Sequence, residues 1–556
     1  MAGSTLRLRP WQRRALDIYE SGQASDFLAV ATPGAGKTTF ALTAARLTLP
    51  ELSGRLIIVA PTRHLKEQWA DAAERFGLML DTDWSPVDGI RSDVHGIVTT
   101  YQQVGSSPEA FPAMADGGFV ILDEIHHAGE ERSWGYGVST AFAGAARRLS
   151  LSGTPFRSDT RSIPFVRYHN NEVVPDIEYG YGDALTDGRV VRPVFFPRFG
   201  GNMEWMAPDG AHLAASFEDP LARTQANQRL RAALSLDGEW LPTVMGHAND
   251  ELIKIREKHP EAGGLVIAMD QAHAWGIADY LRTRHRINAT VAVSEDPDAS
   301  AKITRFASGN APWIVAVRMV SEGVDIPRLR VGVYATTTTT ELFFRQAVGR
   351  IVRWSAGRGR QRAYLFMPDD ARLRHFGAAI SETRRHVLVK KSDAETDGFE
   401  EQENEGLDAL VEDAEQMSLF AVLSATADGL PSDLDIFADD DDPDFDPEAE
   451  KAEEVLSEAD QMLLIDLSSL PPAGPLALTR RGRKERDRLR DLNAELAREL
   501  VDLTGKTHAA VNFELNRLSG VSKVAQATID QLDRRARQGQ QWRERIQKLQ
   551  RMKRFV

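Results

Sequence analysis

Short apolar runs alternate with helix-like stretches along most of the first 390 residues, and this alternation limits the possible folds more than any other feature. The run "RLIIVA" (55–60) is followed by Leu65, Trp69 and Phe76, which recur at helical spacing. Thr62 stands before them, where it can cap the helix. Strands that alternate with helices in this way favour a parallel sheet covered by helices on both faces.

Further apolar runs divide into two groups along the chain. The first group is "GIVTTY", "FVILDE" and "RRLSLSGTP", and the second is "GGLVIAMD", "NATVAVS", "PWIVAVRMV" and "RVGVYATT". We therefore expect two α/β domains, at 1–160 and 262–390, joined by a partly helical connector at 161–261. In parallel sheets the ligand-binding groups lie on loops that follow the carboxyl ends of the strands.

Negative charge is concentrated in one segment. The formal net charge of the chain is −14, but residues 393–460 carry 26 Asp and Glu against one Lys, which leaves the other residues at about +11. Such charge density, with prolines, disfavours a packed core, so we expect an acidic, largely flexible linker at 391–475. It is either a solvated spacer or an acidic mimic that competes with nucleic acid. Within it, "MSLFAVLSA" (417–425) is expected to dock as a small helix.

Beyond the linker, 476–556 is expected to be a basic helical domain. Seven basic residues lie between Arg480 and Arg490, and leucines recur at helical spacing after them. Our hypothesis is that these helices grip nucleic acid through their basic face. An ordinary helical hairpin with solvated charges and a module for a protein partner are the alternatives.

Composition excludes several kinds of site. The chain has no cysteine, so disulfides and thiolate metal sites are excluded, and its 13 histidines follow no ligand-like spacing. The opening "MAGSTLRLRPWQRRAL" lacks the apolar core of a signal peptide, and no stretch approaches the roughly 18 apolar residues of a membrane span. We expect a cytoplasmic protein that does not bind membranes.

The stretch "ATPGAGKTTF" (31–40) has the composition of a phosphate-binding loop. Two glycines let the backbone approach a triphosphate, Lys37 can reach the β- and γ-phosphates, and Thr38 can bind Mg²⁺ at the start of a helix. Ala31 stands where the strict pattern has its first glycine. The predicted nucleotide-binding residues of the loop are Pro33, Gly34, Ala35, Gly36, Lys37, Thr38 and Thr39.

A second stretch, "VILDEIHH" (120–127), ends an apolar strand in two adjacent carboxylates. Such a pair is costly unless a cation lies near. Asp123 is suited to hold Mg²⁺, Glu124 to polarise an attacking water, and His126 to link this site to the chain that follows. The loop and the acidic pair together predict hydrolysis of ATP with Mg²⁺ as cofactor.

In order along the chain, the motifs resemble those of superfamily 2 helicases and translocases of the DExH type, in the branch of restriction-enzyme translocases and excision-repair helicases. "RPWQ" is similar to that family's adenine-reading segment, and "ATPGAGKT", "APTRHLKEQW", "DEIHH" and "LSGTPFR" are similar to its motifs I, Ia, II and III. "LVIAMD", "VSEGVDIP" and "QAVGRIVR" are similar to motifs IV, V and VI. The resemblance covers about residues 6–390.

This resemblance implies two RecA-like domains that clamp one ATP between them. Arg350 and Arg353 are similar to the family's arginine fingers, which neutralise charge on the γ-phosphoryl group. The other implied ATP-site residues are Gln12, Gln346, Gly323 and Asp325, and the residues implied to couple hydrolysis to strand movement are His126, Ser152 and Thr154.

Nucleic acid is expected to lie across the tops of both domains. The resemblance places it on Thr62, Arg63, Thr100 and Tyr101 of the first domain and on backbone amides of the second. Such contacts to phosphates and sugars hold a strand without reading its sequence. "RSWGYG" (132–137) is expected to be a flexible loop whose rings either stack on bases or pack in the core.

We therefore predict an ATP-driven motor on nucleic acid. The wording of "DEIHH" and "SGTPFRSD" favours DNA over RNA through the resemblance alone. Two other hypotheses stay open: an RNA-dependent ATPase, and a clamp whose ATP state recruits a protein partner through the acidic linker or the C-terminal helices.

Overall fold

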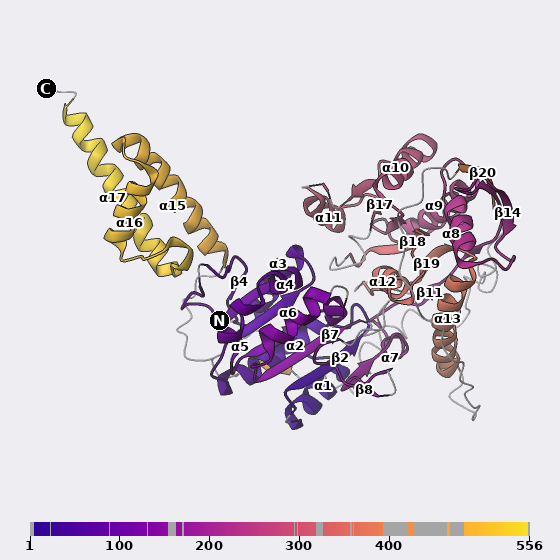
Figure 1. Cartoon of the computed structure of the whole chain (residues 1–556), viewed down its shortest axis with the longest axis horizontal. Helices are drawn as coiled ribbons and strands as arrows, with labels where there is room; N and C mark the ends of the chain where they lie inside the picture. Colours follow the sequence, from indigo (N-terminus) through magenta and orange to yellow (C-terminus); the bar gives the residue numbers. More distant parts are fainter. Residues whose placement is uncertain are drawn as a thin grey trace.

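The computed structural model of the chain describes residues 5–22, 24–87, 89–129, 132–153, 163–169, 172–293, 295–296, 298–317, 326–355, 358–359, 361–392, 421–427, 464–466 and 483–553. These residues form two parallel α/β domains, a small antiparallel sheet and a bundle of three helices (Figure 1). The expected fold class, two RecA-like parallel-sheet domains in tandem with a helical C-terminal region, is confirmed.

The first domain is a sheet of seven parallel strands in the order β10-β2-β7-β6-β3-β5-β4. The strands are β2 (Asp26–Ala31), β3 (Leu56–Ala60), β4 (Leu80–Asp81), β5 (Gly96–Thr100), β6 (Phe119–Leu122), β7 (Arg147–Ser152) and β10 (Ile177–Tyr179). The helices are α1 (Pro10–Ser21), α2 (Lys37–Thr48), α3 (Arg63–Arg75), α4 (Tyr101–Ser106), α5 (Pro112–Ala115), α6 (Arg132–Phe142) and α7 (Tyr181–Thr186). A short ribbon of β8 (Tyr168–His169) and β9 (Glu172–Val173) lies beside the sheet.

Two helices of this domain test the sequence predictions directly. The expected helix after β3 is confirmed as α3, with the Thr62 hydroxyl accepting a hydrogen bond from the Leu65 N–H at 3.4 Å. The expected loop at 132–137 is wrong, because these residues begin α6. The Trp134 ring packs into the core near Gly105, while Tyr136 is 69% exposed. Buried residues one helical turn further on anchor α6 against the sheet and so extend the helix through this stretch.

The second domain is a parallel sheet in the order β11-β19-β18-β15-β17-β16, with β12 also paired to β19. The strands are β11 (Val194–Phe195), β12 (Arg198–Phe199), β15 (Gly263–Ala268), β16 (Thr290–Ala292), β17 (Trp313–Ala316), β18 (Leu329–Ala335) and β19 (Ala363–Pro368). The helices are α8 (Arg223–Ala233), α9 (Trp240–Lys258), α10 (Gln271–His285), α11 (Ala299–Ser308), α12 (Glu341–Ile351) and α13 (Ala371–Ser392). All four apolar runs expected as strands after Gly263 are confirmed.

The residues expected to form a connector contribute to both domains. β10 adds an edge strand to the first sheet, and β11 and β12 join the second. β13 (Asn202–Met206) and β14 (His212–Ser216) form an antiparallel sheet with β20 (Ala421–Thr426). The small helix expected at 417–425 is therefore wrong for the described residues 421–425, because these residues form a strand that pairs with β13, and Ala425 is buried.

Few other residues of the acidic linker are described. β21 (Leu464–Asp466) pairs antiparallel with β1 (Thr5–Arg7) of the first domain. The other described residues of the predicted linker are 391–392, at the end of α13, and 421–427, which include β20. The rest of the linker lies outside the described residues. No helix in the described part of the chain is both long and apolar enough to cross a membrane.

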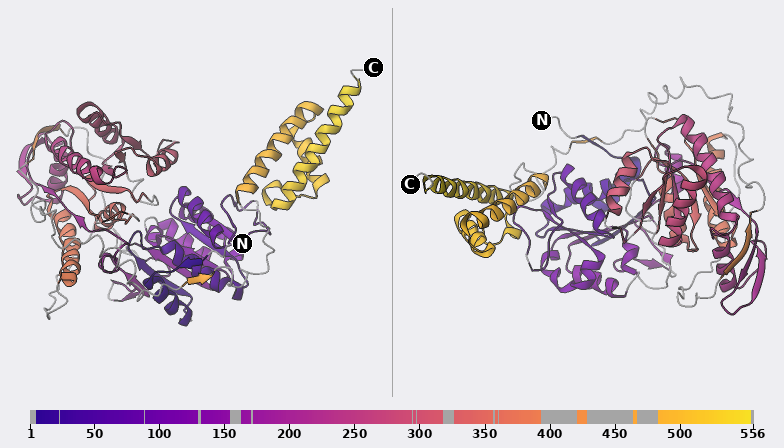
Figure 2. Two further views of the ribbon diagram at one scale, coloured as in Figure 1. Left: turned by 180° about the vertical axis from the view of Figure 1, so that it is seen from behind. Right: turned by 90° about the horizontal axis from the view of Figure 1, so that it is seen from above.

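The C-terminal bundle consists of α15 (Arg483–Thr504), α16 (His508–Ser519) and α17 (Ile529–Lys553) and projects from the β4 side of the first domain, away from the second (Figures 1 and 2). Arg486 of the bundle pairs with Asp81 at 3.3 Å and with Asp83 at 2.8 Å. Arg490 pairs with Asp83 at 2.6 Å. Two arginines of the cluster expected to contact phosphates therefore dock the bundle onto the first domain.

A buried histidine near this docking surface is expected to make folding sensitive to acid. The His95 Nδ1 accepts a hydrogen bond from the Met79 N–H at 2.9 Å, and burial together with the Arg46 charge lowers the pKa of His95 to about 4. The unfolded chain binds this proton at an ordinary pKa of about 6.5, so the free energy of unfolding should fall by about 2 kcal/mol from pH 7 to pH 5. Urea denaturation at the two pH values checks this, with His95→Asn as the variant whose side-chain oxygen accepts the same bond without titrating. An unchanged pH dependence in His95→Asn contradicts the assignment.

Candidate active site

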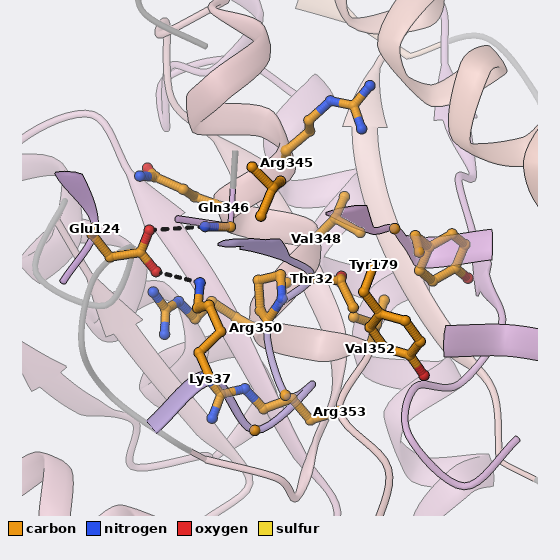
Figure 3. A pocket seen from close by; sticks show the side chains of 18 of the residues that line it. Thr32, Lys37, Glu124, Tyr179, Arg345, Gln346, Val348, Arg350, Val352 and Arg353 are labelled. Carbon is orange, nitrogen blue, oxygen red and sulfur yellow. Dashed lines mark hydrogen bonds and ion pairs between the residues drawn. The ribbon is translucent and has the colours of Figure 1, made fainter. Parts of the chain in front are cut away.

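A cavity of about 350 Å³ lies between the two domains (Figure 3). From the first domain it is lined by the loop after β2 and by the residues after β6, and from the second by α12. Figure 3 shows Lys37, Glu124, Gln346, Arg350 and Arg353 around one space. Residues from both ends of the predicted motif series therefore meet in one cavity.

The loop after β2 has the conformation that an anion needs. Gly34 and Gly36 adopt φ values of +85° and +91°, in the left-handed region that favours glycine. No described residue accepts a hydrogen bond from the N–H groups of Gly34, Gly36, Lys37 or Thr38. Because α2 begins at Lys37, its helix dipole adds to this field of donors. The predicted phosphate cradle is thus present as a geometry.

Three side chains just before α1 and in its first turn hold this loop from behind. The Arg9 guanidinium donates to the Gly34 carbonyl at 2.8 Å, and the Trp11 indole donates to the Ala35 carbonyl at 3.0 Å. The Gln12 amide donates to the Gly36 carbonyl at 2.9 Å and accepts from the Arg9 backbone N–H at 2.8 Å. Carbonyls turned toward these donors leave the N–H groups facing the cavity. Gln12 is buried and braces the loop, so its predicted adenine contact stays a prediction.

The two carboxylates after β6 differ in their surroundings. Glu124 accepts from the Lys37 ammonium at 2.7 Å and from the Gly153 N–H at 3.0 Å. Burial opposes ionisation of Glu124, but Lys37 and His126 outweigh it and hold the pKa of this carboxyl well below its usual value. Burial and the neighbouring Glu124 charge raise the pKa of Asp123 to about 6. The pair thus contains a carboxylate that Lys37 and His126 keep ionised and a carboxyl whose ionised form a cation would stabilise.

Backbone strain accompanies this pair. Glu124 has a φ of +47°, a conformation that few residues other than glycine adopt. Such a conformation costs of order 1–3 kcal/mol and persists where the surrounding contacts over-determine it. Here the contacts to Lys37 and Gly153 hold the carboxylate in place.

Predicted coupling residues connect this pair to the second domain. The His126 Nδ1 lies 3.2 Å from the Ser152 hydroxyl and 3.6 Å from Glu124. On its other side, the His126 Nε2 lies 3.3 Å from the Gln346 amide nitrogen of α12. A continuous path therefore runs from β7 through His126 to the second domain. Thr154, Gly323 and Asp325, also predicted from the motifs, lie outside the described residues.

Helix α12 brings the predicted arginine fingers against the phosphate-binding loop. Arg350 and Arg353 line the cavity. At Gly349 the helix lies close to the loop, since a Cβ added there would lie 2.5 Å from the Pro33 ring. The absence of a side chain at Gly349 is thus what allows α12 to contact the loop.

We expect Gly349→Ala to slow ATP hydrolysis by about five- to 150-fold, since overpacking typically costs 1–3 kcal/mol and the clash is with a ring next to the loop. Steady-state turnover measures this. Gly246→Ala on α9, where an added Cβ meets nothing within 4 Å, is the matched control and should keep normal turnover. Equal rates for both variants would show that α12 does not need this close contact.

The predicted Mg²⁺ ligands fit a cation. Thr38 and Asp123 both line the cavity, and their oxygen atoms suit this metal. The raised pKa of Asp123 arises where two carboxylates lie close together, which a divalent cation would relieve. Among the described residues, no cluster of three or more His, Asp and Glu could bind a metal without other ligands. Mg²⁺ commonly takes one or two carboxylates and completes its shell with phosphates and water.

The predicted nucleic-acid contacts lie at the ends of two neighbouring strands. Thr62 caps α3 after β3, next to Arg63, and Thr100 caps α4 after β5. The Tyr101 side chain is fully buried, so the structure contradicts a direct contact through its ring. Tyr101 instead donates to the Asp123 carbonyl at 2.9 Å.

Four contributors to the site were missed in the sequence: Arg9, Trp11, Trp69 and Gly349. Arg9 and Trp11 stand next to the predicted Gln12, but an arginine and a tryptophan at a helix start carry no motif that predicts a bond to a distant loop. Trp69 was assigned to the apolar face of α3, although its indole N–H is a donor that needs a partner when buried.

Known proteins that are similar to this chain bear on the family resemblance. Residues 5–157 match the model of a family described as type III restriction enzyme, res subunit. The uncharacterized protein Rv2917 of Mycobacterium tuberculosis is 45% identical over 390 residues, which are 68% of this chain and 64% of that protein. The chain thus spans less than two thirds of the length of this relative.

Two better-described proteins are more distant. The DNA 3′-5′ translocase XPB2 of Sulfurisphaera tokodaii is 24% identical over 383 residues, 63% of this chain and 79% of that protein. The type I restriction enzyme EcoKI endonuclease subunit of Escherichia coli is 24% identical over 399 residues, 63% of this chain and 33% of that protein. The resemblance inferred from the motifs is thereby confirmed.

Proposed function

We propose that this chain, which resembles superfamily 2 helicases and translocases of the restriction and repair type in motifs and fold, hydrolyses ATP to move along DNA or to separate its strands. The observation that carries the proposal is the cavity between the domains. It joins a phosphate cradle and an ionised carboxylate of the first domain to two arginines of the second. Hydrolysis then requires the domains to close on one another, which converts chemistry into movement.

In this proposal each residue has a role that follows from its surroundings. Lys37 leaves Glu124 to contact the β- and γ-phosphates of ATP, and the freed Glu124 carboxylate accepts a proton from the attacking water. Arg350 and Arg353 neutralise the charge that develops on the γ-phosphoryl group. Thr38 and Asp123 would hold Mg²⁺, which neutralises phosphate charge when bound.

Movement requires that the second domain sense the state of the first. The contact between Gln346 and His126 crosses the cavity beside Glu124, and it supports a role in this sensing. The N-terminal ends of α3 and α4, with Thr62, Arg63 and Thr100, would hold the sugar-phosphate backbone. We propose DNA as the nucleic acid because the chain is similar to a DNA translocase and to a restriction enzyme subunit.

Steady-state ATP hydrolysis with no nucleic acid, single-stranded DNA, duplex DNA and RNA of matched sequence tests the proposal. Each is measured at two salt concentrations, because phosphate contacts weaken as salt rises. We expect strong stimulation by DNA that falls at the higher salt concentration. Stronger stimulation by RNA, lost when the 2′-hydroxyls are removed, would establish the RNA-dependent ATPase instead. Equal, slow turnover in all samples would favour a clamp that recruits a protein partner.

A further inference from the structure

Two aromatic side chains that are not part of the cavity lining hold Asp123. The Trp69 indole N–H donates to the Asp123 carboxylate at 2.7 Å, and the Tyr101 hydroxyl donates to the Asp123 carbonyl at 2.9 Å. Trp69 is 3% exposed and Tyr101 is 0% exposed. Because water cannot replace these donors, both bonds restrict where the carboxylate points.

The two donors come from the two helices whose first residues are the predicted nucleic-acid contacts. Trp69 lies on α3, which Thr62 caps, and Tyr101 is the first residue of α4, which Thr100 caps. The helices follow β3 and β5, neighbouring parallel strands in which Ala60 is paired with Thr100. Both caps therefore lie at the same edge of the sheet.

Short, rigid connections join each cap to Asp123. Trp69 lies seven residues after Thr62, roughly 10 Å along a helix. Tyr101 directly follows Thr100. No flexible segment separates either helix start from the side chain that donates to Asp123. A small displacement of a helix start should therefore move that donor as well. The bond from Trp69 engages the Oδ2 of Asp123, a residue that also lines the cavity, as expected for a partner that orients a metal ligand.

We propose that Trp69 and Tyr101 are positioning residues that transmit nucleic-acid binding at the starts of α3 and α4 to the metal-binding carboxylate of Asp123. The inference rests on the proposed function and specifies how binding of nucleic acid affects the site of hydrolysis. Nucleic acid that engages the two caps sets the two helices against the sheet, and the two donors then hold Asp123 in the orientation that Mg²⁺ requires.

Phenylalanine at each position separates this role from packing. Tyr101→Phe removes only the donor, and Trp69→Phe keeps a ring in the core but removes the donor together with part of the indole. If the residues merely fill space, both variants should behave like the wild type once their stability is matched by temperature. Trp240→Phe and Tyr280→Phe are the controls, since each removes a comparable bond, at 2.8 Å to the Gly200 carbonyl and at 3.2 Å to the Pro242 carbonyl, from the second domain.

The test measures equilibrium binding of a fluorescent ATP analogue across a series of Mg²⁺ concentrations, with and without the nucleic acid that stimulates the wild type, and turnover under the same conditions. In the wild type, nucleic acid should lower the Mg²⁺ concentration for half-maximal binding. In Trp69→Phe and in Tyr101→Phe this shift should be lost, and the Mg²⁺ requirement should rise by about tenfold or more. The controls should keep the wild-type shift.

The outcomes separate this inference from the proposed function. A wild type stimulated by nucleic acid, with both phenylalanine variants showing an unchanged Mg²⁺ shift, overturns the inference and leaves the proposed function standing. A wild type that no nucleic acid stimulates overturns both. Because the two variants act on different helices, loss of the shift in the one that stays folded is sufficient support if the other fails to fold.

Discussion

Replacing Glu124 by glutamine is expected to lower ATP turnover by about 10²–10⁴-fold while ATP still binds. The glutamine amide has nearly the same shape, but its single oxygen can accept from only one of the two donors, the Lys37 ammonium or the Gly153 N–H, and it has no lone pair basic enough to take a proton from water. The left-handed backbone at this position should be preserved, because glutamine and glutamate have the same carbon skeleton. Turnover and equilibrium binding of ATP, measured on the same preparation, check both halves of the expectation.

Glu251→Gln is the matched control for this change. Glu251 lies on α9, paired with Lys254 at 3.6 Å and remote from the cavity lining, so its replacement should leave turnover unchanged. Wild-type turnover in Glu124→Gln would remove the role of general base from this residue. Loss of ATP binding as well would instead mean that the carboxylate is needed to keep the loop and Lys37 in place.

Arg353→Ala should lower nucleic-acid-stimulated turnover by about 10³–10⁵-fold, the range found for arginine fingers. The residue follows α12 and lines the cavity beside Gly34, where a Cβ added to the glycine would lie 3.4 Å from the Arg353 side chain. Arg353→Lys should recover only part of the loss, because an ammonium keeps the charge but not the two parallel donors of a guanidinium. Single-turnover hydrolysis with saturating ATP measures the chemical step directly.

Arg358→Ala is the control for the loss of a positive charge that lies outside the cavity. Arg358 belongs to the same domain and pairs with Glu261 at 2.9 Å, outside the cavity lining, so its loss should leave hydrolysis near the wild-type rate. Stimulated turnover that survives in Arg353→Ala would mean that closure of the second domain onto the first is not the catalytic event. In that case Arg350, which lies within α12, would be the next residue to replace.

The apolar runs that alternate with helical periods predicted most of the strands of both sheets. These strands are buried on both faces, so their continuous apolar sequence is visible without any knowledge of their partners. Strand β10 was missed because Ile177–Tyr179 is a short edge strand whose pairing with β2 depends on the chain returning to the first domain. β20 was missed for the same reason, since it gains its partner, β13, from more than 200 residues earlier in the chain.

The sequence by itself determined the chemistry of the site. Lys37, Asp123 and Glu124 were identified because phosphate binding and hydrolysis require particular residue types at short spacings, which the linear chain preserves. Arg350 and Arg353 were identified through the resemblance of "QAVGRIVR" to motif VI. Only the tertiary structure decided how these groups are held. The bonds from Arg9 and Trp11 to the loop and from Trp69 to Asp123 join residues 24 to 54 positions apart, and the Gly349 contact joins the two domains. Such contacts depend on which side chains the folded sheets bring together, and no local pattern of residues encodes that proximity.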